Sequence, residues 1–249
     1  MTTPRVIPVS APPRVHHQLQ AAPDGAVRVV HRGRHAVYVE LGGRCVGVVA
    51  ATATAVPCAL RVTALELPFA GEVADVRAGV LHVDGVALVC GRFVDVAVPH
   101  LSAQLLGKGP LLAESRSLSQ QLREYVHPRL DPAAVAELVG SGDGLTPYFD
   151  DVLCGWLAVH RAAGAATPDV DLAVRAHLGR TTLLSATLLQ CAIDGEVLPE
   201  FAARVAAIGT TEEPGCAAAL AAVGHTSGAG LLDGGRRALV DLFARTAAA

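Results

Sequence analysis

Hydrophobic and polar residues alternate along the first part of the chain. Between Val27 and Val98 apolar side chains recur at every second position in short runs, the spacing of strands with one buried face. Turn-forming residues separate these runs, as at Pro23-Asp24-Gly25. The pattern predicts a meander of short antiparallel strands that forms a small β-barrel or sandwich, because the apolar faces of such strands need a cover.

The apolar spacing becomes helical after about Pro110, with breaks at Gly, Pro and Asp. It predicts helices over residues 115–126, 132–138, 147–163, 170–178, 181–193, 199–207, 213–223 and 229–247. Asp233, Gly234 and Gly235 fall inside the last of them and predict a break or a later start. The fold class is therefore α+β, with a β-rich domain over residues 1–106 and an all-helical domain over residues 107–249.

Composition indicates a packed core and argues against two classes of partner. The chain is 51% hydrophobic, which is ample for a core, and its six cysteines are too far apart for a metal motif. A formal net charge of -3 with scattered basic residues argues against a nucleic-acid surface. We see neither a secretory signal nor an apolar stretch of the roughly 18 residues that span a bilayer. We therefore expect a soluble cytoplasmic protein with no membrane partner.

A glycine-rich stretch, Gly-Ser-Gly-Asp-Gly-Leu-Thr-Pro-Tyr-Phe-Asp-Asp over residues 140–151, holds the strongest candidate chemistry. Thr146-Pro147 predicts a helix start, with the threonine hydroxyl as the cap and proline in the first helical position. Glycines let a ligand approach the backbone, and free amides at a helix start favour an anion. We expect a phosphate or carboxylate here. The binding residues assigned in this loop are Gly142, Gly144 and Thr146.

Two acids, Asp150 and Asp151, follow in the first turn of the predicted helix. Acids at a helix start are favourable on a surface, which is one explanation of the pair. Their apolar neighbours favour a functional one instead. Adjacent helical residues point about 100° apart, so at most one acid faces the loop while the other braces nearby backbone. Because carboxylates repel an anion, a functional pair needs either Mg²⁺ between them or a ligand with N–H donors, such as an amide or carbamoyl group.

Two further loops repeat the combination of glycines, hydroxyls and a helix start. His225, in Gly-His-Thr-Ser-Gly, is a candidate general acid or base, or else a capping or packing residue. Arg180 either holds a carboxylate in a bidentate fork or pairs with an acid at the edge of the core. Lys108, in the predicted linker, is either solvated or reaches a ligand. The residues assigned from the two loops are Arg180, Thr181, His225, Thr226, Ser227 and Gly228.

These motifs, in this order, resemble the DUF2877 family. They are the residues 140–151, Arg-Thr-Thr-Leu-Leu-Ser from Arg180 to Ser185 with Gly195-Glu196 beyond it, and residues 224–228. Members of that family include a subunit of bacterial oxamate carbamoyltransferase, which works with two other subunits to interconvert oxalurate plus phosphate with oxamate plus carbamoyl phosphate. The resemblance covers roughly residues 107–245. It implies that all the assigned residues line one site together with Asp150 and Asp151. For carbamoyl transfer we assign catalytic roles to Asp150 or Asp151, which would accept N–H bonds from the substrate, and to His225, which would move a proton.

Three functions follow from these observations. The first is a carbamoyltransferase or a subunit of one, acting on a small amide or ureide carboxylate with phosphate or carbamoyl phosphate. A non-catalytic metabolite-binding or scaffolding subunit is the second, and a metal-dependent hydrolase or lyase of a small amide is the third. Mg²⁺ is the one cofactor considered. The expected partners are a small anion or amide and, for the first function, other carbamoyltransferase subunits.

Overall fold

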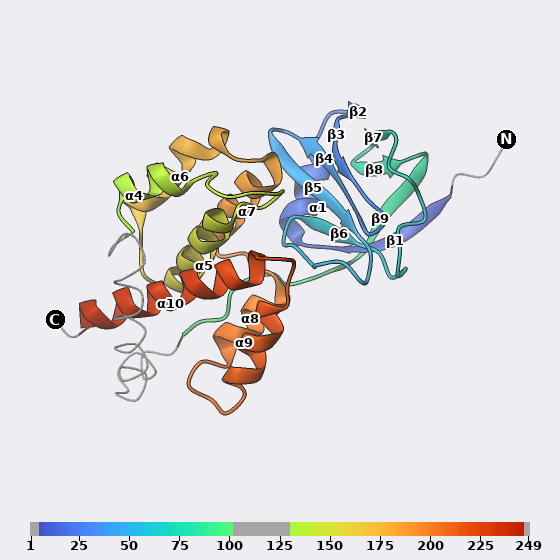
Figure 1. Ribbon diagram of the computed structural model, residues 1–249. Coiled ribbons are helices and arrows are strands. Elements are labelled where there is room, and N and C mark those ends of the chain that lie inside the picture. The colour runs from blue at the N-terminus through green and yellow to red at the C-terminus, as the bar shows by residue number, and fades with distance from the viewer. Residues whose placement is uncertain (1–4, 102–129, 247–249) are drawn as a thin grey trace. The chain divides into compact units, whose positions relative to one another are not determined.

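The computed structural model describes residues 5–101 and 130–246, and it divides the chain into two compact units, residues 1–96 and residues 97–249 (Figure 1). The predicted helix over residues 115–126, Lys108 and the predicted domain boundary after residue 106 lie outside the described residues. Each unit is described by itself below.

The described part of the first unit forms one nine-stranded sheet in the order β2-β7-β8-β9-β1-β6-β5-β4-β3. The strands are β1 Val6–Ala11, β2 Gly25–Val27, β3 Val29–Arg32, β4 Ala36–Leu41, β5 Arg44–Val49, β6 Ala59–Arg61, β7 Ala74–Arg77, β8 Val80–Val83 and β9 Val86–Phe93. Only Arg28 separates the two outermost strands, β2 and β3, along the chain. The sheet must therefore curve back on itself, and it forms a nearly closed barrel (Figure 1).

The predicted small β-barrel is confirmed, but the strands do not all pair as the meander predicts. β1 pairs in parallel with β9, and β5 pairs in parallel with β6, where the meander predicts antiparallel neighbours. The first strand lies before the predicted strand region, and helix α1, Pro13–Gln20, follows it. Side chains from strands and helix together fill the core, among them Val9, Val15, Leu19, Val37, Val48, Leu60 and Leu81. Helix α1 thus supplies part of the cover that the apolar faces need.

Helices make up the second unit as predicted, and an isolated β-bridge joins Ala97 to Glu196 among its described residues. Its elements are α4 Pro132–Leu138, α5 Tyr148–Ala162, α6 Pro168–His177, the 3-10 helix η1 Leu178–Arg180, α7 Leu183–Ile193, α8 Pro199–Ala206, α9 Glu213–Ala221 and α10 Ser227–Thr246. Each α-helix begins and ends within two residues of its predicted bounds. The agreement follows from the Gly, Pro and Asp residues that mark helix ends locally.

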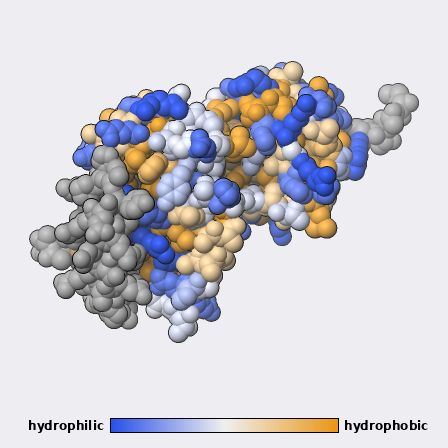
Figure 2. Space-filling view, viewed as in Figure 1, coloured by the Kyte–Doolittle hydropathy of each residue, from blue (hydrophilic) through white to orange (hydrophobic). Residues whose placement is uncertain are grey.

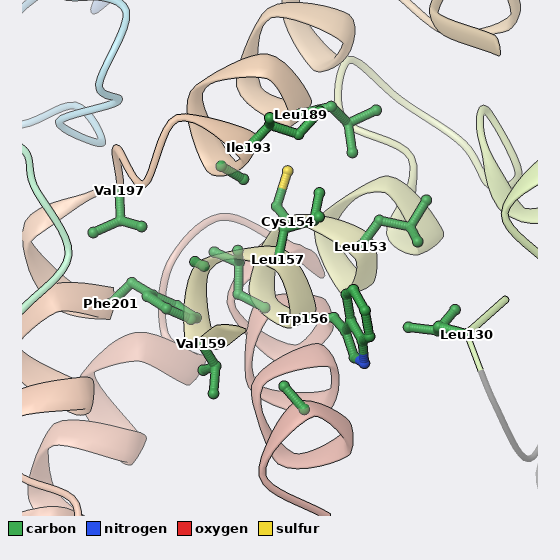
Figure 3. Close-up of a cluster of buried hydrophobic side chains, with 14 of the residues drawn as sticks. Leu130, Leu153, Cys154, Trp156, Leu157, Val159, Leu189, Ile193, Val197 and Phe201 are labelled. Atoms are coloured by element: carbon green, nitrogen blue, oxygen red, sulfur yellow. The ribbon is translucent and has the colours of Figure 1, made fainter. Parts of the chain in front are cut away.

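Helix α5 lies at the centre of this unit. Its residues from Asp150 to His160 are all buried, which is typical of a helix covered on every side. Figure 3 shows Leu153, Cys154 and Leu157 of α5 close to residues of α7, and all of them belong to one apolar cluster. The remaining labelled members include Leu189, Ile193, Val197 and Phe201.

Glycines allow α5 and α10 to pack backbone to backbone (Figure 1). A Cβ atom on Gly234 would lie 1.9 Å from the carbonyl oxygen of Val152, and one on Gly155 would lie 2.2 Å from that of Leu231. The close approach expected at Gly155 is therefore present. The break predicted near Asp233 is wrong, since α10 continues through it and uses the glycine for packing.

Large apolar side chains are exposed in both units. They are Val6, Leu65, Val73, Val89 and Phe93 in the first and Leu145 and Leu172 in the second. On the face drawn in Figure 2, hydrophobic areas are interspersed with hydrophilic ones. None of the described helices combines the length and the hydrophobicity needed to cross a lipid bilayer.

Candidate functional site

Hydrogen bonds between hydroxyls and oxygen atoms join the three loops that the sequence singles out. The hydroxyl of Thr146 lies 2.9 Å from that of Ser227, at the start of α10. Thr182 donates its hydroxyl to the carbonyl oxygen of Leu145 over 2.5 Å. The three loops, far apart in sequence, therefore meet around the first turn of α5.

Asp150 is fully buried, and both of its carboxylate oxygens accept hydrogen bonds. Oδ1 accepts from the amide of Gly140 over 2.8 Å, and Oδ2 accepts from the hydroxyls of Ser185 over 2.6 Å and Thr181 over 2.5 Å. A carboxylate with three donors is well compensated for its burial. Asp150 is thus the acid that braces the neighbouring loops.

Asp151 is only 4% exposed, and its surroundings differ. Its Oδ2 atom is buried without a hydrogen-bond partner among the described residues. Burial raises the pKa of Asp151 to about 7; the hydroxyls of Ser227 and Thr146 oppose this rise, and the charge of Asp150 adds to it. Protonated and ionised forms of this carboxyl therefore coexist near neutral pH.

Asp151 is one of the residues that line a cavity of about 40 Å³ between α5, α7, α10 and the segment that leads into α8. The other lining residues are Cys154, Ala158, Leu188, Ala192, Glu196, Val197, Leu198, Phe201 and Leu231. Burial raises the pKa of the Cys154 thiol well above its usual range, so the thiol is protonated. We call this cavity, which shares Asp151 with the joined loops, the Asp151 pocket.

Sequence reasoning did not find the Asp151 pocket. In the sequence, Cys154 is one of six cysteines that are too far apart for a metal motif, and Glu196 belongs to a motif without an assigned role. Cys154 follows Asp151 by three positions, and residues three apart share one face of a helix. That spacing is the local signal that could have indicated a shared wall. No pattern in the sequence indicates that Phe201 of α8 and Leu231 of α10 line the same pocket.

The start of α5 differs from the prediction. Pro147 is the N-cap, and no side chain caps the helix, because the Thr146 hydroxyl pairs with Ser227 instead. The amide of Phe149 donates to the carbonyl oxygen of Ser141 over 3.3 Å, so the chain itself occupies part of the first turn. The first turn of α5 therefore has no side-chain cap, and one of its amides is already hydrogen-bonded within the protein.

The two loop glycines assigned to ligand binding have different surroundings. Gly142 has a φ of 121°, and a Cβ there would lie 2.8 Å from the amide nitrogen of Tyr148, so this glycine lets the loop fold over the helix start. Gly144 has a φ of 90°, and the space beside its Cα is open. Of the two, Gly144 is the one whose backbone a ligand can approach.

Other predicted site residues lie on the surface around the loops. Arg180 is exposed, and its guanidinium donates to the carbonyl oxygen of Ala136 in α4. His225 and Thr226 are also exposed. Gly228, by contrast, is a packing residue, because a Cβ there would lie 1.9 Å from the carbonyl oxygen of Leu220. These four residues are not among those that line the Asp151 pocket.

The two acids do not offer a cation a pair of free carboxylates. Asp150 has both oxygens engaged, which leaves one oxygen of Asp151. Within residues 5–101 and 130–246 no group of three or more His, Cys, Asp or Glu side chains could hold a metal ion. The described donors therefore do not match the Mg²⁺ bridge considered from the sequence.

The segment that carries these contacts also resembles a known family. Residues 138–239 match the family model of the oxamate carbamoyltransferase subunit AllH. The AllH match confirms the resemblance indicated by the three motifs, and it contains both acids and all three loops. No match was found among curated proteins or among solved structures. The AllH resemblance thus concerns the helical unit that builds the Asp151 pocket.

Proposed function

We propose that this chain is a subunit of a carbamoyltransferase that acts on a small amide or ureide carboxylate of the oxamate or oxalurate kind, with phosphate or carbamoyl phosphate. The observation that carries the proposal is the buried Asp151 carboxyl with an unpaired oxygen, set in the segment that matches AllH. Buried acids with a raised pKa beside a cavity are typical of functional sites.

The chemistry requires one group that can both hold and release a proton. When phosphate attacks the carbamoyl carbon of oxalurate, a C–O bond forms and the C–N bond to the oxamate nitrogen breaks. That nitrogen then takes up a proton and leaves as an amide. A carboxyl with a pKa of about 7 suits this role, because it donates in one direction and accepts in the other.

The anionic end of the substrate and the phosphate need positive charge or amide donors. Arg180, His225 and Thr226 are exposed near the joined loops, and the backbone at Gly144 is open. In this proposal they bind the anions outside the Asp151 pocket, while Asp151 serves the nitrogen. Asp150 acts as a positioning residue for the loops, since its oxygens are already occupied.

A scaffolding subunit without catalysis is the second candidate. It is favoured by the extent to which the loops bond to one another, since the hydroxyls of Thr146, Thr182 and Ser227 contact other parts of the chain. Under that function, substitutions at Asp151 change the assembly of the complex and leave its turnover number unaltered.

Turnover by the assembled complex tests the proposal. The chain is purified with its partner subunits, and carbamoyl phosphate formed from oxalurate and phosphate is measured. We expect Asp151→Asn to lower kcat by about 10²- to 10⁴-fold, the usual contribution of a positioned acid or base. Asp169→Asn, at an exposed position of α6, is the matched control and should keep wild-type turnover.

Two results decide against the proposal. Absence of carbamoyl phosphate with all subunits present rules out the transferase function. Wild-type kcat in Asp151→Asn, together with a changed assembly measured by light scattering, supports the scaffolding subunit.

A further inference from the structure

The wall of the Asp151 pocket is mostly apolar. Apart from Asp151 and Glu196, it consists of aliphatic side chains, Phe201 and Cys154, whose thiol is kept protonated by burial. Alanines contribute to the wall from α5 and α7, and their short side chains leave room between the larger ones. The pocket therefore offers a ligand apolar surface and close contacts rather than hydrogen bonds.

The pocket extends from the first turn of α5 into the helical unit. Asp151, Cys154 and Ala158 have the spacing of residues on one face of a helix, and they cover roughly 10 Å along its axis at 1.5 Å per residue. Figure 3 shows Cys154 together with Val197 and Phe201, which belong to the same wall. Because Asp151 also adjoins the joined loops, a ligand held at the loops can extend a side group along this face.

The volume of the pocket calls for an apolar occupant. About 40 Å³ has room for roughly three or four water-sized groups, and native interiors contain few voids larger than one water molecule. Water is a poor occupant, because a buried water needs about two to four polar partners. Among the described residues of the wall, only Asp151 and Glu196 have strongly polar side chains. The pocket is therefore suited to an apolar group of about three or four heavy atoms.

The ionisable side chains of the pocket exclude anions. Asp151 and Glu196 are acids, and no Arg, Lys or His side chain is among the described residues that line the pocket. A carboxylate or phosphate that entered would meet like charge in an apolar setting, where repulsion is strong. The anionic parts of a ligand therefore stay outside.

We infer that the Asp151 pocket is a specificity pocket for a short aliphatic group of the substrate, about three or four carbons in size. The inference rests on the proposed function for the ureide, the carboxylate and the phosphate, and it adds a further part of the substrate. Ureide carboxylates of the form H₂N–CO–NH–CHR–COO⁻ carry such a group at R. Oxamate and oxalurate carry none, so they leave the pocket unfilled.

Calorimetric titration of the purified chain with ureide carboxylates that differ only at R tests the inference. The series is the N-carbamoyl derivatives of glycine, alanine, valine and phenylalanine, in which R is hydrogen, methyl, isopropyl and benzyl. Burial of one CH₂ group strengthens binding about fourfold, so we expect the affinity to rise about 60-fold from the glycine to the valine derivative. The phenylalanine derivative should bind more weakly than the valine derivative, because its ring exceeds the pocket.

Two variants change the size of the pocket in opposite directions. Ala192→Leu fills it from the buried face of α7 and should abolish the advantage of the valine derivative over the glycine derivative. Leu188→Ala widens it from a half-buried position and should raise the affinity for the phenylalanine derivative to at least that for the valine derivative. Ala219→Leu, at an exposed position of α9, is the matched control for the added leucine. If Ala192→Leu does not fold, as judged by Trp156 fluorescence, Leu188→Ala decides alone.

Equal affinity of wild type for the glycine and valine derivatives overturns the inference, as does a preference that neither folded variant alters. If no derivative binds, the proposed function loses its ligand class, and isobutanol then tests the pocket alone. Methyl NMR should show saturable shifts of Leu188 and Leu231 with isobutanol in wild type and none in Ala192→Leu. Absence of these shifts in wild type overturns the inference independently of the proposed function.

Discussion

The two units of this chain differ in what they bury. Among the described residues, every buried polar or charged side chain belongs to the helical unit: Asp150, Asp151, His160, Thr167, Ser185 and Thr187. The sheet unit buries apolar side chains, apart from a tyrosine and two cysteines. Because burying a polar group costs free energy, a fold keeps such groups where they compensate one another or serve a purpose. The comparison assigns candidate chemistry to the helical unit.

Within the helical unit, the two neighbouring acids differ in how fully their carboxylate oxygens are hydrogen-bonded. Asp150 receives three hydrogen bonds, whereas Asp151 retains an unpaired oxygen beside a cavity. Full pairing is expected of a structural acid and incomplete pairing of one that awaits a ligand. The two therefore should respond differently to substitution.

Replacement of Asp150 should produce the largest effect. Asp150→Ala leaves one buried and two part-buried donors without their acceptor, and each unmade bond costs about 1–3 kcal/mol, so we expect the free energy of unfolding to fall by about 3 kcal/mol or more. Urea unfolding followed by the fluorescence of Trp156, the one tryptophan in the chain, reports on the helical unit. A loss below about 1 kcal/mol, or one equal to that of Asp169→Ala, would remove the bracing role.

A pH-dependent effect at Asp151 should come next. Its folded pKa of about 7 lies above the usual 3.8, so the folded state holds the proton more tightly and stability falls as the pH rises from about 4 to 7. Between pH 5 and pH 8 this contribution amounts to about 2–3 kcal/mol at 1.36 kcal/mol per pH unit. Asp151→Asn should remove it.

The measurement is the difference between wild type and variant, in urea midpoints at the two pH values. That difference cancels the contributions of all other titrating groups. Parallel pH profiles of wild type and Asp151→Asn would show that the acid is not destabilised by burial.

A substitution in the sheet unit should have the smallest effect. Glu40 of β4 pairs with Arg28 on the surface, where the arginine side chain is 68% exposed. Exposed ion pairs contribute little, so Glu40→Gln should change the free energy of unfolding by less than about 0.5 kcal/mol in circular-dichroism melts. If Glu40→Gln lowered the free energy of unfolding as much as Asp150→Ala, polar contacts in the two units would contribute equally to stability.

Local signals explain which parts of the fold could be predicted. Helix ends follow from Pro, Gly and Asp residues next to them, and strand positions follow from alternation. The parallel pairing of β1 with β9 could not be predicted, because it joins Val6 to Ala87 through contacts that no short-range pattern encodes. Likewise, the prediction that Thr146 caps α5 is wrong because its hydroxyl pairs with that of Ser227, which lies 81 positions away in the sequence.

The candidate site could be predicted in part. The three loops were singled out, and their contacts bring them to the same helix start. Which acid faces a cavity depends on how α5 is rotated against α7 and α10, and sequence spacing does not fix that rotation. The packing role of Gly228 could not be predicted either, because it depends on how closely α10 approaches the carbonyl oxygen of Leu220 in α9.

The glycine contacts between α5 and α10 also bear on the order in which the chain acquires its chemistry. Asp151 lies beside Gly230, and its hydroxyl neighbour Ser227 begins the final described helix. Before that helix docks, water reaches the carboxyl, and the acid titrates as an ordinary aspartate. A ribosome-bound chain that ends before α10 therefore carries the complete glycine-rich loop and both acids without this cover, and the docking of α10 raises the pKa of Asp151 toward about 7.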